Sequence, residues 1–145
     1  MKITVTGHRP ERIKGHEKEI YEWFKEKFAA IRPSEVITGM AQGVDQIAAQ
    51  AAKDMGINYL CVYPYKRNVS AVEQDLIDSS SGVVWLANEY FEGCFIARDR
   101  WMVDRSDKVL AVWDGKPGGG TYYTMNYAND NNKLEDTYIV KESKN

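Results

Sequence analysis

The sequence has few cysteines. Its 145 residues include two, Cys61 and Cys94, which form no framework of regularly spaced cysteines. A small fold that depends on disulfide bonds carries a dense, even set of cysteines, so this class of protein is excluded. Two isolated thiols are typical of a protein in a reducing compartment. We therefore expect a cytoplasmic protein.

The sequence also lacks a long hydrophobic run. No apolar stretch approaches the ~20 residues that a membrane-spanning helix needs. Met1 and Lys2 lead straight into a short predicted strand, without the apolar core of a signal peptide. Both observations agree with a cytoplasmic protein that has no membrane partner.

An excess of positive charge and clusters of histidine are absent as well. The formal charge is −2 and the isoelectric point is about 5.7, whereas a protein that coats nucleic acid needs a basic surface. This balance argues against nucleic acid as a partner, although it is compatible with a local basic pocket. The histidines are His8 and His16, and such a small number argues against a zinc site. We expect neither a metal nor a cofactor.

The composition is that of an ordinary globular domain. Hydrophobic residues make up 43% and charged residues 28% of the chain, which is enough apolar material for one core. A length of 145 residues is short for two such cores. We therefore predict a single domain, residues 1–145.

Short apolar or β-branched segments alternate with helical patterns along the whole chain. The pattern predicts strands at residues 3–6, 35–38, 57–63, 82–86, 108–113 and 137–140. Helices are predicted at residues 16–30, 44–55, 94–105 and 121–129, with a further short helix inside 69–81. Such alternation with short connections predicts an α/β fold, in which helices cover both faces of a mainly parallel sheet.

Three of the predicted strands end in glycine. Ligands of parallel sheets bind at the carboxyl ends of the strands, and glycine lets main-chain N–H groups approach an anion there. After the fifth strand, Pro117 and three glycines prevent a regular element, and the helix that starts near Thr121 adds its free N-terminal donors. This junction predicts a phosphate site. The alternative is a flexible strand-to-helix loop without a ligand.

Four short motifs lie at these strand ends and on the helix before the fifth strand. They are Thr6-Gly7-His8-Arg9-Pro10; Gly39-Met40-Ala41-Gln42-Gly43-Val44-Asp45; Arg98 followed by Met102-Val103-Asp104-Arg105-Ser106-Asp107; and Val112-Trp113-Asp114-Gly115 with Gly119-Gly120-Thr121. Together they resemble the SLOG superfamily of Rossmann-like domains, in particular its small stand-alone bacterial and phage members, over roughly residues 3 to 128. The resemblance implies a Rossmann-like three-layer sandwich that handles nucleotides. Other members are the lonely-guy phosphoribohydrolases, which cleave the N-glycosidic bond of nucleoside monophosphates, and sensor domains that bind ADP-ribose-type signals.

The sequence departs from the lonely-guy pattern at one informative position. Those enzymes carry a glutamate in the first helical turn after the glycine–threonine pair, and the residue that matches it by spacing is Thr124. A hydroxyl cannot stabilise an oxocarbenium-like centre or relay a proton as a carboxylate does. The resemblance therefore implies that the protein binds a nucleotide or ADP-ribose-like molecule, as a sensor or by sequestering it.

Two alternatives remain open. One is a nucleotide N-glycosidase or phosphoribohydrolase in which Asp45, Asp114 or a neighbour replaces the missing glutamate. The other is a subunit that acts through a dimer surface, and a homo-oligomer is compatible with every reading. No residue is assigned a catalytic role.

The predicted ligand contacts come from the loops after the first, second and fifth strands and from the helix at 94–105. They are Gly7, His8, Arg9, Gly39, Met40, Ala41, Gly43, Asp45, Arg98, Asp114, Gly118, Gly119, Gly120 and Thr121. Several of these residues have a structural alternative. The glycines at 39 and 43 could permit close packing, Asp45 could stabilise a helix N-terminus, Asp114 could cap a turn, and Arg98 could pair with Asp104 or Asp107.

Overall fold

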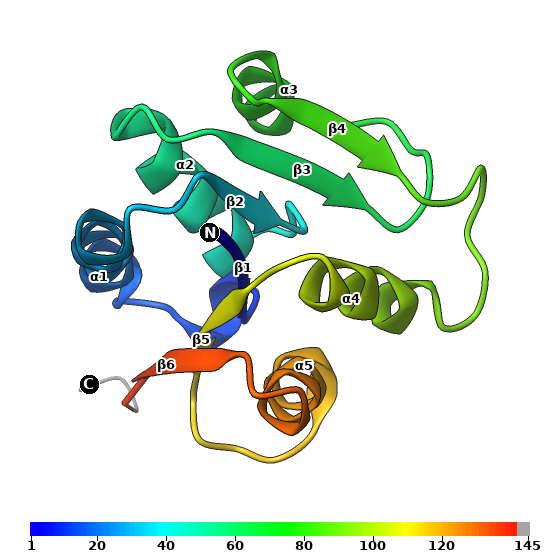
Figure 1. The fold of residues 1–145 in the computed structure, drawn as a ribbon. Helices are drawn as coiled ribbons and strands as arrows, with labels where there is room; N and C mark the ends of the chain where they lie inside the picture. Colours follow the sequence, from blue (N-terminus) through cyan, green and yellow to red (C-terminus); the bar gives the residue numbers. More distant parts are fainter. Residues whose placement is uncertain (142–145) are drawn as a thin grey trace.

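Residues 1–141 fold around one parallel six-stranded sheet with helices on both faces (Figure 1). These are the residues that the structure, a computed structural model, describes. The strands are β1 (Lys2–Gly7), β2 (Glu35–Thr38), β3 (Tyr59–Tyr63), β4 (Gly82–Trp85), β5 (Lys108–Trp113) and β6 (Leu134–Ile139). The helices are η1 (Pro10–Arg12, a short 3-10 helix), α1 (Glu17–Ile31), α2 (Val44–Asp54), α3 (Ala71–Asp78), α4 (Cys94–Asp104) and α5 (Gly119–Asp130). The predicted α/β class and Rossmann-like three-layer fold are confirmed.

The strand order creates a switch point beside β1. The order is β4-β3-β2-β1-β5-β6, and every neighbouring pair is parallel. The chain therefore grows outward from β1 to β4, and α4 then leads it back across the sheet to place β5 on the other side of β1. In open parallel sheets, ligands bind outside the carboxyl ends of the strands at such a reversal.

The alternation of side chains along β1 separates the two faces of the sheet. Ile3 and Val5 point into the main core, which lies between the sheet and α1, α2 and α3. Thr4 points to the opposite face, where its hydroxyl donates a hydrogen bond to the main-chain oxygen of Met102 in α4 (3.0 Å). Smaller apolar clusters beneath α4 and α5 complete this second face, so the fold has helix, sheet and helix layers.

Several element boundaries differ from the prediction by one to three residues, and the starts of α5 and β6 bear most on the fold. Helix α5 begins at Gly119, so Gly119 and Gly120 belong to its first turn instead of the preceding loop. The first turn tolerates glycine because its N–H groups have no partner within the helix in any case. Strand β6 begins at Leu134, earlier than the predicted residue 137. It is an edge strand in which Glu135 and Asp136 follow each other, so the first half of the strand shows no apolar alternation in the sequence.

Within the described residues, no helix combines the length and the apolar character that crossing a bilayer requires.

Close packing at the end of β1 depends on Gly7. A Cβ atom at this position would lie 2.3–2.5 Å from the side-chain carbons of Val44, the first residue of α2. We expect Gly7→Ala to lower the free energy of unfolding by about 1–3 kcal/mol, because the added methyl group overpacks this contact. Urea denaturation measures the difference.

Gly82→Ala is the matched control. Its added Cβ would lie 3.5 Å from a Leu60 methyl group, which is an ordinary van der Waals distance. The control should therefore change stability much less than Gly7→Ala. Equal stability of Gly7→Ala and the native protein would contradict the packing explanation.

Candidate functional site

A pocket of about 290 Å³ opens at the carboxyl ends of the strands, where the switch point lies. Its walls come from the end of β1 and η1, from Ala41 and Asp45, from one side of α4, and from Gly120 and Thr121 at the start of α5. We call it the switch-point pocket. The strand order therefore brings four segments that are far apart in the sequence to one hollow.

A second pocket of about 320 Å³ lies beside it. The loop before α2, the loop between β3 and α3, and α4 line this pocket, which we call the β3-side pocket. Both pockets are lined by Arg9, Ala41, Phe95 and Arg98. The two hollows thus share a wall.

The structure brings most of the predicted contacts to these pockets. The predicted residues that line the switch-point pocket are Gly7, His8, Arg9, Ala41, Asp45, Arg98, Gly120 and Thr121. Gly39 and Met40 line the β3-side pocket alone. Four predicted residues line neither pocket: Gly43, Asp114, Gly118 and Gly119. Lining a pocket is a matter of position, and the role of these residues as ligand contacts stays a prediction.

Arg98 is a buried cation in the wall between the two pockets. Its side chain is mostly buried (7% of the residue is exposed), and its Nε donates to Asp99 Oδ1 at 2.9 Å. Its Nη1 donates to the main-chain oxygen of Gly39 at 2.8 Å, which ties α4 to the end of β2. The buried ion-pair partner of Arg98 is therefore Asp99 instead of the expected Asp104 or Asp107, whose carboxylates accept from the Tyr127 hydroxyl and from the Lys2 main-chain N–H.

The approach of Arg98 explains the glycine at position 39. A Cβ on Gly39 would lie 2.7 Å from Arg98 Nη1 and 2.9 Å from Asp45 Oδ2. A second glycine of the same motif has a similar reason. Gly43 has a φ angle of 100°, and a Cβ there would lie 2.4 Å from the main-chain oxygen of His8. The structural alternative of close packing therefore accounts for both glycines.

Asp45 is a buried carboxylate on the floor of the switch-point pocket. It lies in the first turn of α2, is 8% exposed, and accepts a hydrogen bond from the Ala41 main-chain N–H at 3.2 Å. Burial raises the pKa of Asp45 to about 7, against the opposing effect of Arg98. Burial also raises the pKa of Asp99. Two carboxylates therefore surround one guanidinium group.

His8 and Asp114 hold the ends of β1 and β5 together. His8 Nε2 lies 3.1 Å from the Asp114 main-chain N–H and 3.3 Å from Asp114 Oδ1. Burial and the nearby Arg12 lower the pKa of His8, against the opposing effect of Asp114. The Asp114 carboxylate accepts two hydrogen bonds from Arg12 (2.8 Å each) and one from the Lys116 main-chain N–H. The structure thus shows the turn-capping role of Asp114.

The start of α5 presents free main-chain donors beside the switch-point pocket. Gly118 precedes the helix with a φ angle of 97°, and no side chain caps the helix. The first-turn N–H groups have no partner within the helix, and the positive end of the helix dipole lies with them. Gly120 and Thr121 line the pocket, so this turn can receive an anion there.

The arginines around the two pockets differ in their partners. Arg12 pairs with Asp114, Arg98 with Asp99, and Arg67 with Glu73. Arg9 lines both pockets, and within residues 1–141 its guanidinium forms no hydrogen bond or ion pair. Arg9 is therefore the pocket arginine whose charge is available to a ligand.

Sequence reasoning missed Asp99. This residue lines the switch-point pocket, and its Oδ2 lies 3.1 Å from the Thr124 hydroxyl. Its carboxylate thus lies beside Thr124 on the neighbouring helix, the residue that matches the lonely-guy glutamate by spacing in the sequence. In the sequence, only its position directly after Arg98 pointed to Asp99. That Asp99 faces the pocket follows from the packing of α4 on α5, which the sequence does not show.

The raised pKa of Asp45 predicts a pH dependence of stability. In an unfolded chain the pKa of aspartate is about 3.9, so between about pH 4 and 7 the folded protein holds a proton that the unfolded chain has lost. The stabilisation from this proton is fully present below about pH 4 and is lost as the pH rises through about 7. Asp45→Asn removes the titration. We therefore compare the free energy of unfolding of the variant with that of the native protein by urea denaturation. The difference, variant minus native, should be larger at pH 8 than at pH 5.

Asp54→Asn, at the other end of α2, is the control. Hydrogen bonds from Tyr21 and Gln50 lower the pKa of Asp54, so this carboxyl is ionised from pH 5 to 8. Its replacement should change stability by the same amount at both pH values. An Asp45→Asn variant with the same pH dependence as the native protein would show that Asp45 is ionised throughout this range.

No protein-family model matches the chain, and a comparison with curated proteins found no match. Solved structures do match. DNA processing protein A (DprA) from Streptococcus pneumoniae superposes with a TM-score of 0.66 at 19% identity, covering 93% of this chain and 49% of that one. DprA from Helicobacter pylori gives 0.68 at 21% identity, over 92% of this chain and 64% of that one. The molybdenum cofactor carrier protein from Chlamydomonas reinhardtii gives 0.68 at 18% identity, over 97% of this chain and 76% of that one.

The chain spans from about half to just under two thirds of the length of the two DprA structures that it matches. At these identities the likeness establishes the fold. It agrees with the motifs at the ends of β1, β2 and β5 and with the strand order around the switch point. The chain therefore has a Rossmann-like α/β fold, as the alternation of strands and helices in its sequence predicts.

Proposed function

We propose that residues 1–145 form a single SLOG-like domain that binds a phosphate-bearing small molecule of the nucleotide or ADP-ribose type, as a sensor or by sequestering it. The observation that carries the proposal is the position of Arg9. Its guanidinium is free of carboxylate partners within residues 1–141 and stands in the wall of the switch-point pocket. A free guanidinium in a concave site favours an anion that accepts several hydrogen bonds, and phosphate does so.

The start of α5 supplies the second half of a phosphate site. Gly120 and Thr121 line the same pocket as Arg9 and Arg12. Main-chain N–H groups at a helix start bind phosphate through hydrogen bonds and through the helix dipole. We therefore place the phosphate between Arg9 and the first turn of α5.

The carboxylates on the pocket floor favour a sugar over a bare anion. Asp45 and Asp99 both line the switch-point pocket, and each is a hydrogen-bond acceptor when ionised. Inorganic phosphate would bring more negative charge to this floor. A ribose phosphate brings hydroxyl groups, which can donate hydrogen bonds to the carboxylates while the phosphate stays at Arg9.

The structural neighbours are consistent with a phosphate-bearing ligand. The Chlamydomonas protein is a molybdenum cofactor carrier, and the Helicobacter protein binds single-stranded DNA. The expectation that nucleic acid is no partner therefore finds no support among the neighbours. A hollow of about 290 Å³ lies at the small end of the range for ligand pockets, which favours a single nucleotide unit.

Binding measurements with two variants test the phosphate site. The probes are AMP, GMP, CMP, UMP, ADP-ribose and inorganic phosphate, measured by calorimetry. We expect at least one nucleotide to bind the native protein. Arg9→Ala should weaken its binding roughly ten- to a hundredfold, because a charge-assisted bond to phosphate is lost. Gly120→Val should abolish binding, because its side chain projects toward Asp99 and the pocket.

Both variants should keep the fold. Gly120 has no positive φ angle, and an added Cβ would lie 3.9 Å from Asp99 Oδ2, so a side chain fits there without backbone strain. Arg100→Ala, which removes an exposed arginine of α4 outside both pockets, should bind as the native protein does. If both variants bind as tightly as the native protein, the phosphate site is in the wrong place, and if no probe binds the native protein, the proposed ligand class is wrong.

Cleavage of the N-glycosidic bond is a second candidate, favoured by the place of the Asp99 carboxylate beside Thr124. The Asp99 carboxylate is ion-paired with Arg98, and the residue at the glutamate position itself is a threonine, whose hydroxyl cannot relay a proton as a carboxylate does. We therefore expect no appreciable release of free base when nucleoside monophosphates are incubated overnight with the native protein and analysed by chromatography. Release that disappears in Asp99→Asn would establish the hydrolase instead.

A further inference from the structure

The β3-side pocket extends the site beyond the proposed phosphate position. It shares Arg9, Ala41, Phe95 and Arg98 with the switch-point pocket. A ligand anchored at the shared wall can therefore reach both hollows.

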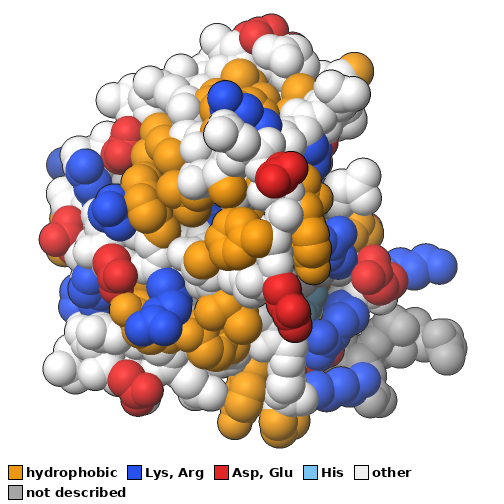
Figure 2. Space-filling view, turned by 90° about the vertical axis from the view of Figure 1, so that its right-hand side faces the viewer, with side chains coloured by type: hydrophobic (Ala, Val, Ile, Leu, Met, Phe, Trp, Pro, Cys, Tyr) orange, Lys and Arg blue, Asp and Glu red, His pale blue; other side chains and the backbone are white. Residues whose placement is uncertain are grey.

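Aromatic side chains form one side of the β3-side pocket. Tyr65 and Phe95 both line it, with ring centres 6.4 Å apart and planes inclined at 73°. The ring of Tyr90 packs against both. Phe95 nevertheless remains 43% exposed. Figure 2 shows hydrophobic side chains gathered on the face of the molecule that carries α4. A cluster of aromatic rings with an exposed face is suited to stacking on a flat apolar group.

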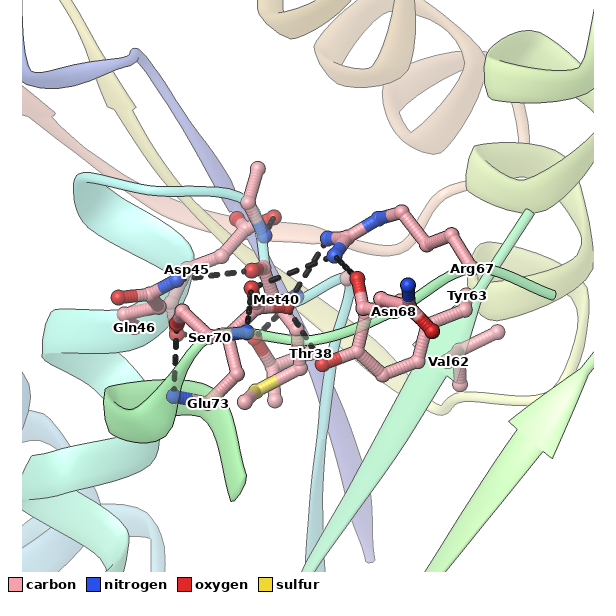
Figure 3. Close-up of polar contacts among 12 residues, drawn as sticks. Thr38, Met40, Asp45, Gln46, Val62, Tyr63, Arg67, Asn68, Ser70 and Glu73 are labelled. Atoms are coloured by element: carbon pink, nitrogen blue, oxygen red, sulfur yellow. Dashed lines mark hydrogen bonds and ion pairs between the residues drawn. The ribbon is translucent and has the colours of Figure 1, made fainter. Parts of the chain in front are cut away.

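The charges deeper in the β3-side pocket already have partners. Arg67 Nη1 and Nη2 donate to the two oxygens of Glu73 at 3.3 and 2.9 Å (Figure 3). Glu73 also accepts from the Tyr63 hydroxyl at 2.8 Å and, as part of a capping box at the start of α3, from the Ser70 main-chain N–H. The Arg67 guanidinium lies over the Tyr63 ring at 4.9 Å. This network fixes the loop between β3 and α3 and leaves its charges balanced.

We propose that the β3-side pocket holds a planar heteroaromatic ring of the same ligand, packed against Phe95 and Tyr65, while the phosphate lies in the switch-point pocket. The balanced pair of Arg67 and Glu73 offers no free charge to a second phosphate, whereas the aromatic wall favours a neutral ring. The inference rests on the proposed function, because the ring is tethered to the phosphate at Arg9. It identifies the ligand as a ring-bearing sugar phosphate, with affinity supplied by the ring as well as by the phosphate.

The test compares a ligand that has the ring with one that lacks it. Native protein, Phe95→Ala and Tyr65→Ala are titrated by calorimetry with the nucleoside monophosphate that binds most tightly and with ribose 5-phosphate. We expect each variant to weaken nucleotide binding roughly tenfold, the order of a lost base–aromatic stack. The affinity for ribose 5-phosphate should stay unchanged. Phe95→Trp should retain nucleotide binding, because it keeps an aromatic face.

Ile96→Ala is the matched control. Ile96 is the next residue of α4, is 46% exposed and lines neither pocket, so its replacement should leave both affinities unchanged. The proposal is overturned if the native protein binds ribose 5-phosphate as tightly as the nucleotide, or if the Phe95 and Tyr65 variants bind the nucleotide normally. A loss of ribose 5-phosphate binding equal to the loss of nucleotide binding would also overturn it. Failure of the proposed function is distinct, because then neither ligand binds the native protein.

Discussion

The buried guanidinium of Arg98 is the interaction on which the site depends. A buried charge is tolerated only when its hydrogen bonds and its counter-charge are supplied, and Arg98 obtains them from the Gly39 main-chain oxygen and from Asp99. This requirement pins α4 against the end of β2. It also explains why position 39 lacks a side chain, and it places Phe95, one turn earlier on α4, at the wall between the two pockets. One buried cation thus fixes the shape of the hollow that we propose as the ligand site.

The same cation leaves the floor of the switch-point pocket short of positive charge. Asp45 and Asp99 both lie near Arg98, and burial raises the pKa of each. One guanidinium cannot fully compensate two carboxylates in a partly desolvated site. A ligand that brings hydrogen-bond donors to this floor relieves the imbalance, whereas a ligand that brings only negative charge worsens it. For this reason we propose that the phosphate lies at Arg9 and the start of α5, and that the sugar hydroxyls lie over the two carboxylates.

Much of this architecture could be predicted from the sequence, because it depends on local patterns. The apolar run of β5, the helical periodicity of α1 and the glycines at three strand ends predict a parallel sheet with its site at the carboxyl edge. The partner of Arg98 could not be predicted in this way. Asp99 is its neighbour in sequence, but the competing partners Asp104 and Asp107 are excluded only by contacts with α5 and β1. The β3-side pocket was missed for a related reason, since Tyr65 and Phe95 meet through the packing of α4 beside β3.

The glycines of the motifs do not all have the same structural reason. Close packing explains three of them but does not explain Gly120. Gly7, Gly39 and Gly43 are required by close contacts with Val44, Arg98 and the His8 main chain, so packing alone explains them. Gly120 has no such requirement, because its φ angle is not positive and an added Cβ would meet no atom closer than 3.9 Å. Gly120 lies at the edge of the pocket that Arg9 also lines, and a ligand that needs this space is the explanation that we propose for it.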